Sequence, residues 1–73
     1  MKAGEALQKK RHEKRLSQSM LAHMAGISIA TLRSYEQGIR DINKASAETV
    51  VLLAKWLECS PEEIMNSEYE TQQ

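Results

Sequence analysis

The sequence predicts an all-α fold, a compact bundle of five helices in one domain. Three observations predict it. Apolar residues recur at helical three-and-four spacing, serines stand where helix N-caps belong, and glycines stand where helices end. With 73 residues there is room for a single small core, which we expect over residues 1–66, with residues 67–73 as a frayed tail.

Residues 3–14 are predicted to form the first helix, with Ala6 and Leu7 as its core contacts. Arg15 then occupies a tight connection where glycine would be easier. If Arg15 takes a positive φ there, about 1 kcal/mol of strain is stored in the connection.

Residues 16–38 are predicted to form two short helices joined by a sharp turn. A serine caps each helix and a glycine ends it; the caps are Ser17 and Ser28, and the glycines are Gly26 and Gly38. The helices are expected over 18–25 and 29–37, with Leu21, Ala25, Ile27 and Leu32 meeting between them. Such a pair is a helix-turn-helix unit, whose second helix can enter a DNA major groove. An ordinary αα-corner is the alternative, but the caps, glycines and periodicity together favour the unit.

A fourth helix is predicted over 44–58, capped by Asn43. Its apolar stripe comprises Ala47, Val50, Val51, Leu53, Ala54 and Leu57. Leu52 and Trp56 lie off this stripe, so they are either additional core or a patch that a partner covers. Ser60 and Pro61 begin a short fifth helix over 61–66, in which Ile64 is the expected core residue and Met65 a second candidate for burial.

The net charge is zero, yet the charges are unevenly distributed. Residues 1–44 carry nine basic and four acidic side chains, a net charge of +5, whereas residues 45–73 carry one basic and six acidic side chains, a net charge of −5. The basic half contains the helix-turn-helix, which favours nucleic acid as the partner.

Several function classes are not supported by the sequence. No apolar run is long enough to span a membrane, and three aromatic residues provide little for stacking single-stranded nucleic acid. His12, His23 and Cys59 are too scattered for a metal site, and no nucleophile–base spacing or phosphate loop is present. We therefore expect a cytoplasmic protein that is not an enzyme and has no cofactor, metal or small-molecule site.

Residues 7–65 resemble the phage repressor/Cro-like (XRE class) helix-turn-helix domain. The matching segments are LSQSMLA at 16–22, AGIS at 25–28, TLRSYEQG at 31–38 and LAKWLECSPEEI at 53–64. The resemblance implies a five-helix, lambda-repressor-like bundle that binds double-stranded operator DNA as a symmetric homodimer.

The resemblance also implies roles for individual residues. The positions that meet base edges are Ile29, Ala30 and Ser34, with Arg33 beside them. Gln18 and Ser28 match phosphate-contacting positions, and Arg11 and Glu36 match a buried ion pair. From their placement we add Thr31, Arg40, Lys44, Lys10 and Lys14 as phosphate contacts.

Three departures from the family pattern matter here. The connection over 41–45 is longer than in the shortest relatives, which bears on its phosphate contacts. Ile29 and Ala30 stand where many relatives carry amide side chains. They can touch thymine methyl groups but cannot make the two hydrogen bonds by which an amide recognises adenine. Arg33 is therefore left to read guanine, unless it contacts a phosphate. Glu58 replaces the glycine common at the end of the fourth helix, which leaves the path into the fifth helix open.

The predicted function is a sequence-specific regulator of transcription, a repressor that binds a palindromic operator as a homodimer. The alternative is an antitoxin-type module that binds a toxin-like partner and regulates its own operon. The candidate dimer or partner surface comprises Leu52, Trp56 and Met65.

Overall fold

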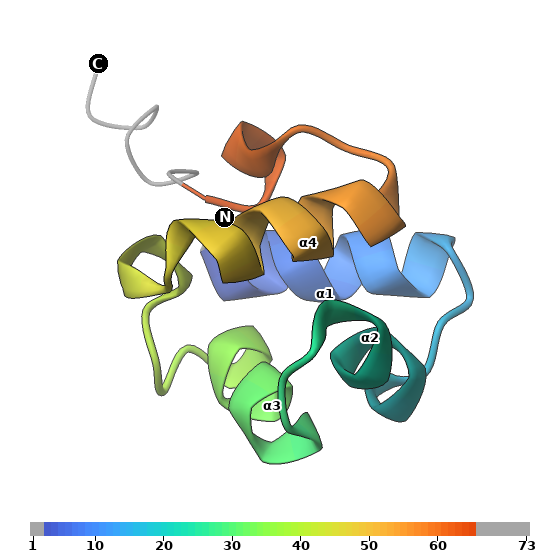
Figure 1. Cartoon of the computed structure of the whole chain (residues 1–73), viewed down its shortest axis with the longest axis horizontal. Helices are drawn as coiled ribbons and strands as arrows, with labels where there is room; N and C mark the ends of the chain where they lie inside the picture. The colour runs from blue at the N-terminus through green and yellow to red at the C-terminus, as the bar shows by residue number, and fades with distance from the viewer. Residues whose placement is uncertain (1–2, 66–73) are drawn as a thin grey trace.

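The computed structural model describes residues 3–65, and within them the chain forms four α-helices and two single 3₁₀ turns (Figure 1). The elements in chain order are α1 (Ala3–Glu13), α2 (Gln18–Ala25), α3 (Ile29–Gln37), η1 (Ile42–Lys44), α4 (Ala47–Leu57) and η2 (Pro61–Glu63). The all-α class is confirmed. The expected fifth helix is only the single turn η2, and the expected tail lies outside the described residues.

The ends of α2 and α3 are as predicted. Ser17 and Ser28 are the N-caps, and their hydroxyl oxygens accept from the amides of Met20 and Thr31, both at 3.0 Å. Each helix ends in a glycine with left-handed backbone: φ is 72° at Gly26 and 81° at Gly38.

Two non-glycine residues also adopt left-handed backbone. Arg15 has φ 57°, so the condition for strain in the connection between α1 and α2 is met. Glu58 has the same φ and ends α4 in the position that glycine commonly fills. The chain thus keeps the sharp turn into η2 without a glycine.

The predicted start of the fourth helix is wrong. The carboxylate of Asp41 accepts from the amide of Asn43 at 2.9 Å and begins the short turn η1, which buries Ile42. Helix α4 begins later, where the Ser46 hydroxyl oxygen accepts from the amide of Thr49 at 3.2 Å. Asn43 is therefore inside a 3₁₀ turn and does not cap α4.

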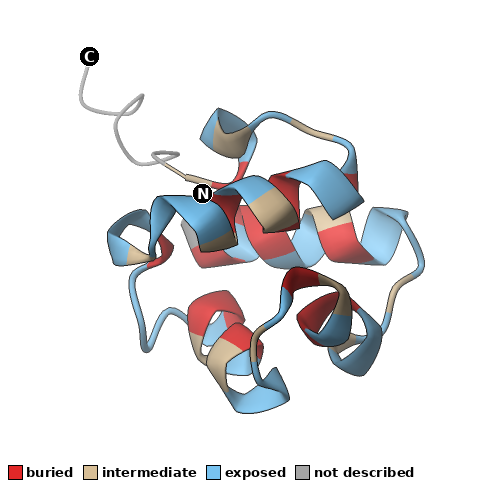
Figure 2. Ribbon diagram, viewed as in Figure 1, coloured by how far each residue is buried: buried red, intermediate tan, exposed pale blue. Residues whose placement is uncertain are grey.

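The core forms where the inner faces of the helices meet (Figure 2). Helix α1 packs against α3, α2 packs against α3 and α4, and α4 packs against η2. The apolar side chains buried there are Ala6, Leu7, Leu21, Ala22, Ala25, Leu32, Tyr35, Ile42, Val50, Leu53, Ala54, Leu57 and Ile64. The predicted apolar stripe of α4 is too wide, because Ala47 and Val51 are exposed. Between α2 and α3, the predicted core residue Ile27 is only half-buried.

The contact between α1 and α3 is close enough to require a glycine. Gly4 is buried, and a Cβ atom there would meet the carbonyl oxygen of Tyr35 and lie 2.8 Å from that of Glu36. The start of α1 therefore lies directly on the backbone at the end of α3. None of the helices within residues 3–65 has the length and apolarity needed to cross a membrane.

Candidate nucleic-acid interface

Helix α3 has one buried face and one outward face. Leu32, Tyr35 and Glu36 are buried against the other helices. The expected base-contacting residues lie on the remaining surface: Ile29, Ala30 and Arg33 are exposed, and Ser34 is half-buried. The structure therefore places this predicted set on one helix with its exposed members toward solvent.

The first turn of α3 is rigidly capped. The Ser28 hydroxyl accepts from the Thr31 amide and donates to the Thr31 hydroxyl oxygen at 2.8 Å. Both expected phosphate contacts are thus side by side at the helix start, where the backbone N–H groups and the helix dipole favour an anion.

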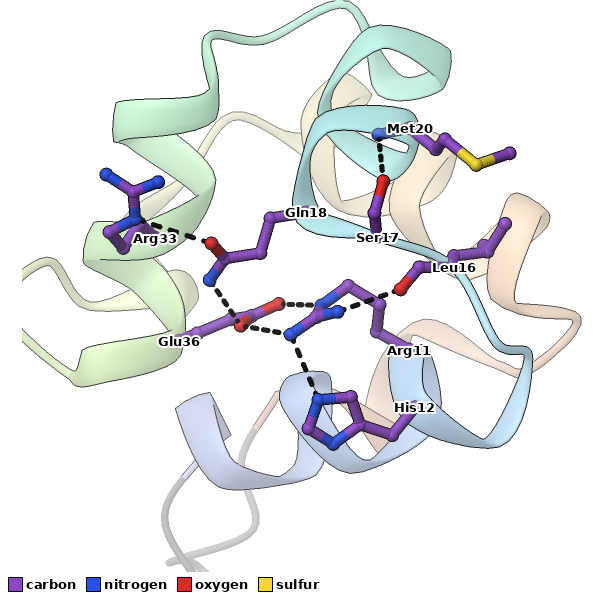
Figure 3. A network of polar contacts seen from close by, with 8 residues as sticks. All are labelled: Arg11, His12, Leu16, Ser17, Gln18, Met20, Arg33 and Glu36. Carbon is purple, nitrogen blue, oxygen red and sulfur yellow. Dashed lines mark hydrogen bonds and ion pairs between the residues drawn. The ribbon is translucent and has the colours of Figure 1, made fainter.

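A buried ion pair joins α1 to α3 (Figure 3). Arg11 Nε donates to Glu36 Oε2 at 2.6 Å, and Arg11 Nη2 donates to Oε1 at 3.1 Å. Both side chains are almost fully enclosed, with 8% and 1% of their surface exposed. Arg11 Nη1 also donates to the carbonyl oxygen of Leu16 at 2.8 Å, so one guanidinium fixes α1, α3 and the connection before α2.

Gln18 has a role that sequence reasoning missed. Its Nε2 donates to Glu36 Oε1 at 3.0 Å, and its Oε1 accepts from Arg33 Nε at 3.3 Å (Figure 3). The side chain therefore bridges the buried ion pair to the outward face of α3. No local signal could have found this contact, because Gln18 is on α2 while Arg33 and Glu36 are on α3, and only the packing of the two helices brings them together.

The expected phosphate contacts beyond α3 are exposed. Arg40 lies two residues past Gly38, with its guanidinium 5.4 Å from the centre of the Tyr35 ring. Lys44 lies at the end of η1. Both positive charges follow α3 in the chain, on the connection to α4.

Lys10 and Lys14 are held by carboxylates instead. The Lys10 amine lies 2.9 Å from Glu63 Oε1, and the Lys14 amine pairs with Glu58. The hydrogen bond with Glu63 raises the pKa of Lys10, and the bond with Lys14 lowers the pKa of Glu58. Lys10 ties α1 to η2, and Lys14, which follows α1, pairs with the residue that ends α4. The structure does not bring either lysine to the outward face of α3.

The three residues of the expected dimer or partner surface differ in their exposure to solvent. Leu52 and Met65 are half-buried and pack against the core. Trp56 is 40% exposed, and the Lys55 amine lies 5.5 Å from its ring centre. Val51, predicted for the core, is 54% exposed on the same helix.

Residues 3–65 contain no group of three His, Cys, Asp or Glu side chains that could hold a metal ion. Cys59 is half-buried, and this burial raises the pKa of its thiol.

A family model described as helix-turn-helix matches residues 7–64, most of the chain. The chain belongs to the phage repressor/Cro-like class of helix-turn-helix proteins. No curated protein sequence matches this helix-turn-helix protein.

Solved structures agree with the family. The P22 c2 repressor in complex with a synthetic operator is 25% identical, with a TM-score of 0.80 over 89% of this chain and 94% of that one. The restriction-modification controller protein C.AhdI from Aeromonas hydrophila is 30% identical, with a TM-score of 0.75 over 86% of this chain and 91% of that one. The SinR protein, in its complex with the SinI protein, is 26% identical, with a TM-score of 0.79 over 93% of this chain and 64% of that one.

Proposed function

We propose that this helix-turn-helix protein is a sequence-specific regulator of transcription that places α3 in the major groove of duplex DNA. The observation that carries the proposal is the outward face of α3, which presents Ile29, Ala30 and Arg33 to solvent while the opposite face is anchored by the Arg11–Glu36 pair. Membership of the family supports it, as does the likeness to a P22 repressor bound to an operator.

The side chains on α3 suit different parts of the groove. Ile29 and Ala30 provide apolar contact for thymine methyls, and the Arg33 guanidinium can donate two parallel hydrogen bonds to guanine. Ser34 is the fourth proposed base contact. The proposed phosphate contacts are Gln18 through its backbone amide, Ser28, Thr31, Arg40 and Lys44.

Lys10 and Lys14 are left out of this set because of their carboxylate partners. Glu58 and Glu63 neutralise them within the molecule. In Figure 1, α4 and η2, which follow Lys44 in the chain, lie on the side of the molecule away from α3. This arrangement leaves the acidic turns clear of a duplex that contacts α3.

We further propose a homodimer that represses transcription at a palindromic operator. Two copies related by a two-fold axis would place their α3 helices in successive major grooves, about 10 base pairs apart. The candidate contact between the copies is the surface of Leu52, Trp56 and Met65, in which Trp56 is the exposed aromatic anchor.

Selection of bound sequences from a random duplex pool tests the proposal. We expect two inverted half-sites with centres about 10 base pairs apart. Log affinity for the selected operator should fall linearly with log salt, by about 0.9 for each phosphate neutralised. Failure to enrich any sequence, or an affinity that does not change with salt, would contradict the proposed mechanism.

A second candidate function is an antitoxin-type interaction with another protein. The likeness to SinR in complex with SinI, together with exposed Val51 and Trp56 on α4, favours it. Sedimentation of the purified protein separates the two candidates. If the protein is a homodimer and Trp56→Glu converts it to monomers, the homodimeric repressor is supported. If the wild type is a monomer that still binds its operator, the exposed surface of α4 is available to a different protein, and the antitoxin-type interaction is supported.

A further inference from the structure

We propose that Gln18 is a specificity-determining residue that positions Arg33 for base recognition. The inference rests on the proposed function and deepens it. Its basis is a chain of contacts that runs from the buried ion pair to the outward face of α3, through the side chain of Gln18 (Figure 3).

The first step is the fixed position of Glu36. Its two carboxylate oxygens accept from two nitrogens of Arg11, and only 1% of the side chain is exposed. Two parallel charge-assisted bonds determine both the distance and the plane of a carboxylate. Glu36 Oε1 therefore presents a fixed acceptor to the start of α2.

The second step is the orientation of the Gln18 amide, which its neighbours dictate. A carboxylate can only accept hydrogen bonds and a guanidinium can only donate them. The NH₂ group of Gln18 must therefore face Glu36, and its oxygen must face Arg33. This is the observed orientation, with Gln18 Nε2 3.0 Å from Glu36 Oε1 and Gln18 Oε1 3.3 Å from Arg33 Nε. A flipped amide would place oxygen against carboxylate and NH₂ against guanidinium, losing both bonds.

The third step is the edge of Arg33 that remains for DNA. The bond to Gln18 uses Nε, so the guanidinium directs its other edge, formed by Nη1 and Nη2, away from α2. That edge carries the two parallel N–H groups that match the O6 and N7 acceptors of guanine. A guanidinium held in this way has already lost part of the rotamer freedom that binding would remove.

Gln18→Met tests the assignment, because methionine has the length of glutamine without its amide. We would measure competition between the selected operator and variants of each base pair. The base pair that Arg33 contacts is the one at which Arg33→Ala loses discrimination. We expect Gln18→Met to reduce discrimination there by about tenfold, the effect of one hydrogen bond to a charged group, and to leave the other base pairs unchanged.

The matched control is Gln8→Met, which makes the same change on the exposed surface of α1 and should alter no base preference. The decisive comparison is a double-variant cycle. In the Arg33→Ala background, Gln18→Met should produce no further loss of discrimination. An equal loss in both backgrounds would show that the Gln18 side chain reads the base independently of Arg33, and a uniform loss of affinity for every sequence would assign that side chain to a phosphate. Either result would overturn the proposal.

A second measurement needs no DNA. In the free protein, exchange of the Arg33 Nε proton with water, followed by NMR, should be slower in the wild type and in Gln8→Met than in Gln18→Met. Equal exchange in all three folded proteins would overturn the proposal. If the wild type selects no duplex sequence, the proposed function fails, and this measurement still decides whether Gln18 restrains Arg33.

Discussion

At the scale of single residues, the Arg11–Glu36 pair is a positioning device. Burial removes hydration from both charges, and their attraction together with the bonds to Leu16 and Gln18 offsets this loss. The pair therefore contributes less to stability than its geometry suggests. Its main effect is to fix the separation of α1 and α3.

Glu36→Gln should destabilise the protein strongly, because it leaves the Arg11 charge buried opposite a neutral group. We expect the free energy of unfolding to fall by about 3 kcal/mol, as measured by urea denaturation. The exposed Glu62→Gln is the control and should change little. Arg11→Met combined with Glu36→Leu should recover much of the loss, and a double variant as unstable as Glu36→Gln would contradict this account.

Gly4→Ala should also destabilise, although alanine is the better helix former by about 1 kcal/mol. The new methyl would lie 2.8 Å from the carbonyl oxygen of Glu36, which is backbone and cannot move aside alone. We expect a net loss of about 1–3 kcal/mol in thermal or urea unfolding. Gln8→Ala, on the exposed surface of the same helix, is the control. A gain of stability in Gly4→Ala would show that α1 shifts freely on α3.

At the scale of elements, η2 is attached to α1 by charge as well as by the core residue Ile64. Glu63 accepts from the Lys10 amine and from the Ser60 amide, and these two contacts lower the pKa of its carboxyl from 4.5 to about 2. The charged form is therefore favoured in the folded state. Its contribution to stability is present above pH 4.5 and is lost as the pH falls toward 2.

Glu63→Gln should expose this dependence. The difference in unfolding free energy between wild type and variant should be constant from neutral pH to about pH 5 and should shrink between pH 4.5 and 2. Urea titrations at a series of pH values measure it, with Glu62→Gln as the control. If the difference in unfolding free energy between wild type and variant instead grows as the pH falls, the charged Glu63 carboxylate does not stabilise the fold and the ion pair with Lys10 is refuted.

At the scale of the whole molecule, internal pairing decides which positive charges are available to DNA. Lys10 and Lys14 belong to the basic half of the sequence, yet each faces a carboxylate from the acidic half. Arg40 and Lys44 are exposed on the connection after α3. The uneven charge along the chain is therefore a coarser guide to the DNA-binding surface than the folded arrangement.

Salt dependence distinguishes these two groups of basic residues. Arg40→Ala should reduce the slope of log affinity against log salt by about 1, since one phosphate contact is lost. Lys10→Ala and Lys14→Ala should leave the slope unchanged once folding is verified. If either lysine variant reduces the slope of log affinity against log salt, that lysine contacts a DNA phosphate.

The features that the sequence determined are the local ones. The serine caps and glycine stops of α2 and α3 follow from residues within a few positions of one another, and so does the outward placement of Ile29 and Arg33 on α3. The sequence also marked Arg15 as a position where glycine would be easier, and its φ is 57°.

The tertiary structure decided what depends on contacts between elements. Asp41, Asn43 and Ser46 are all competent caps, and burial of Ile42 in the core accompanies the choice of Asp41 for η1 and Ser46 for α4. Gln18 was predicted to contact phosphate, and that stays a prediction. The internal partners of its side chain lie 15 and 18 residues away on α3 and could not be predicted. Helical periodicity specifies which face of a helix is buried, whereas the partner of a polar side chain is fixed only when helices distant in the sequence pack together.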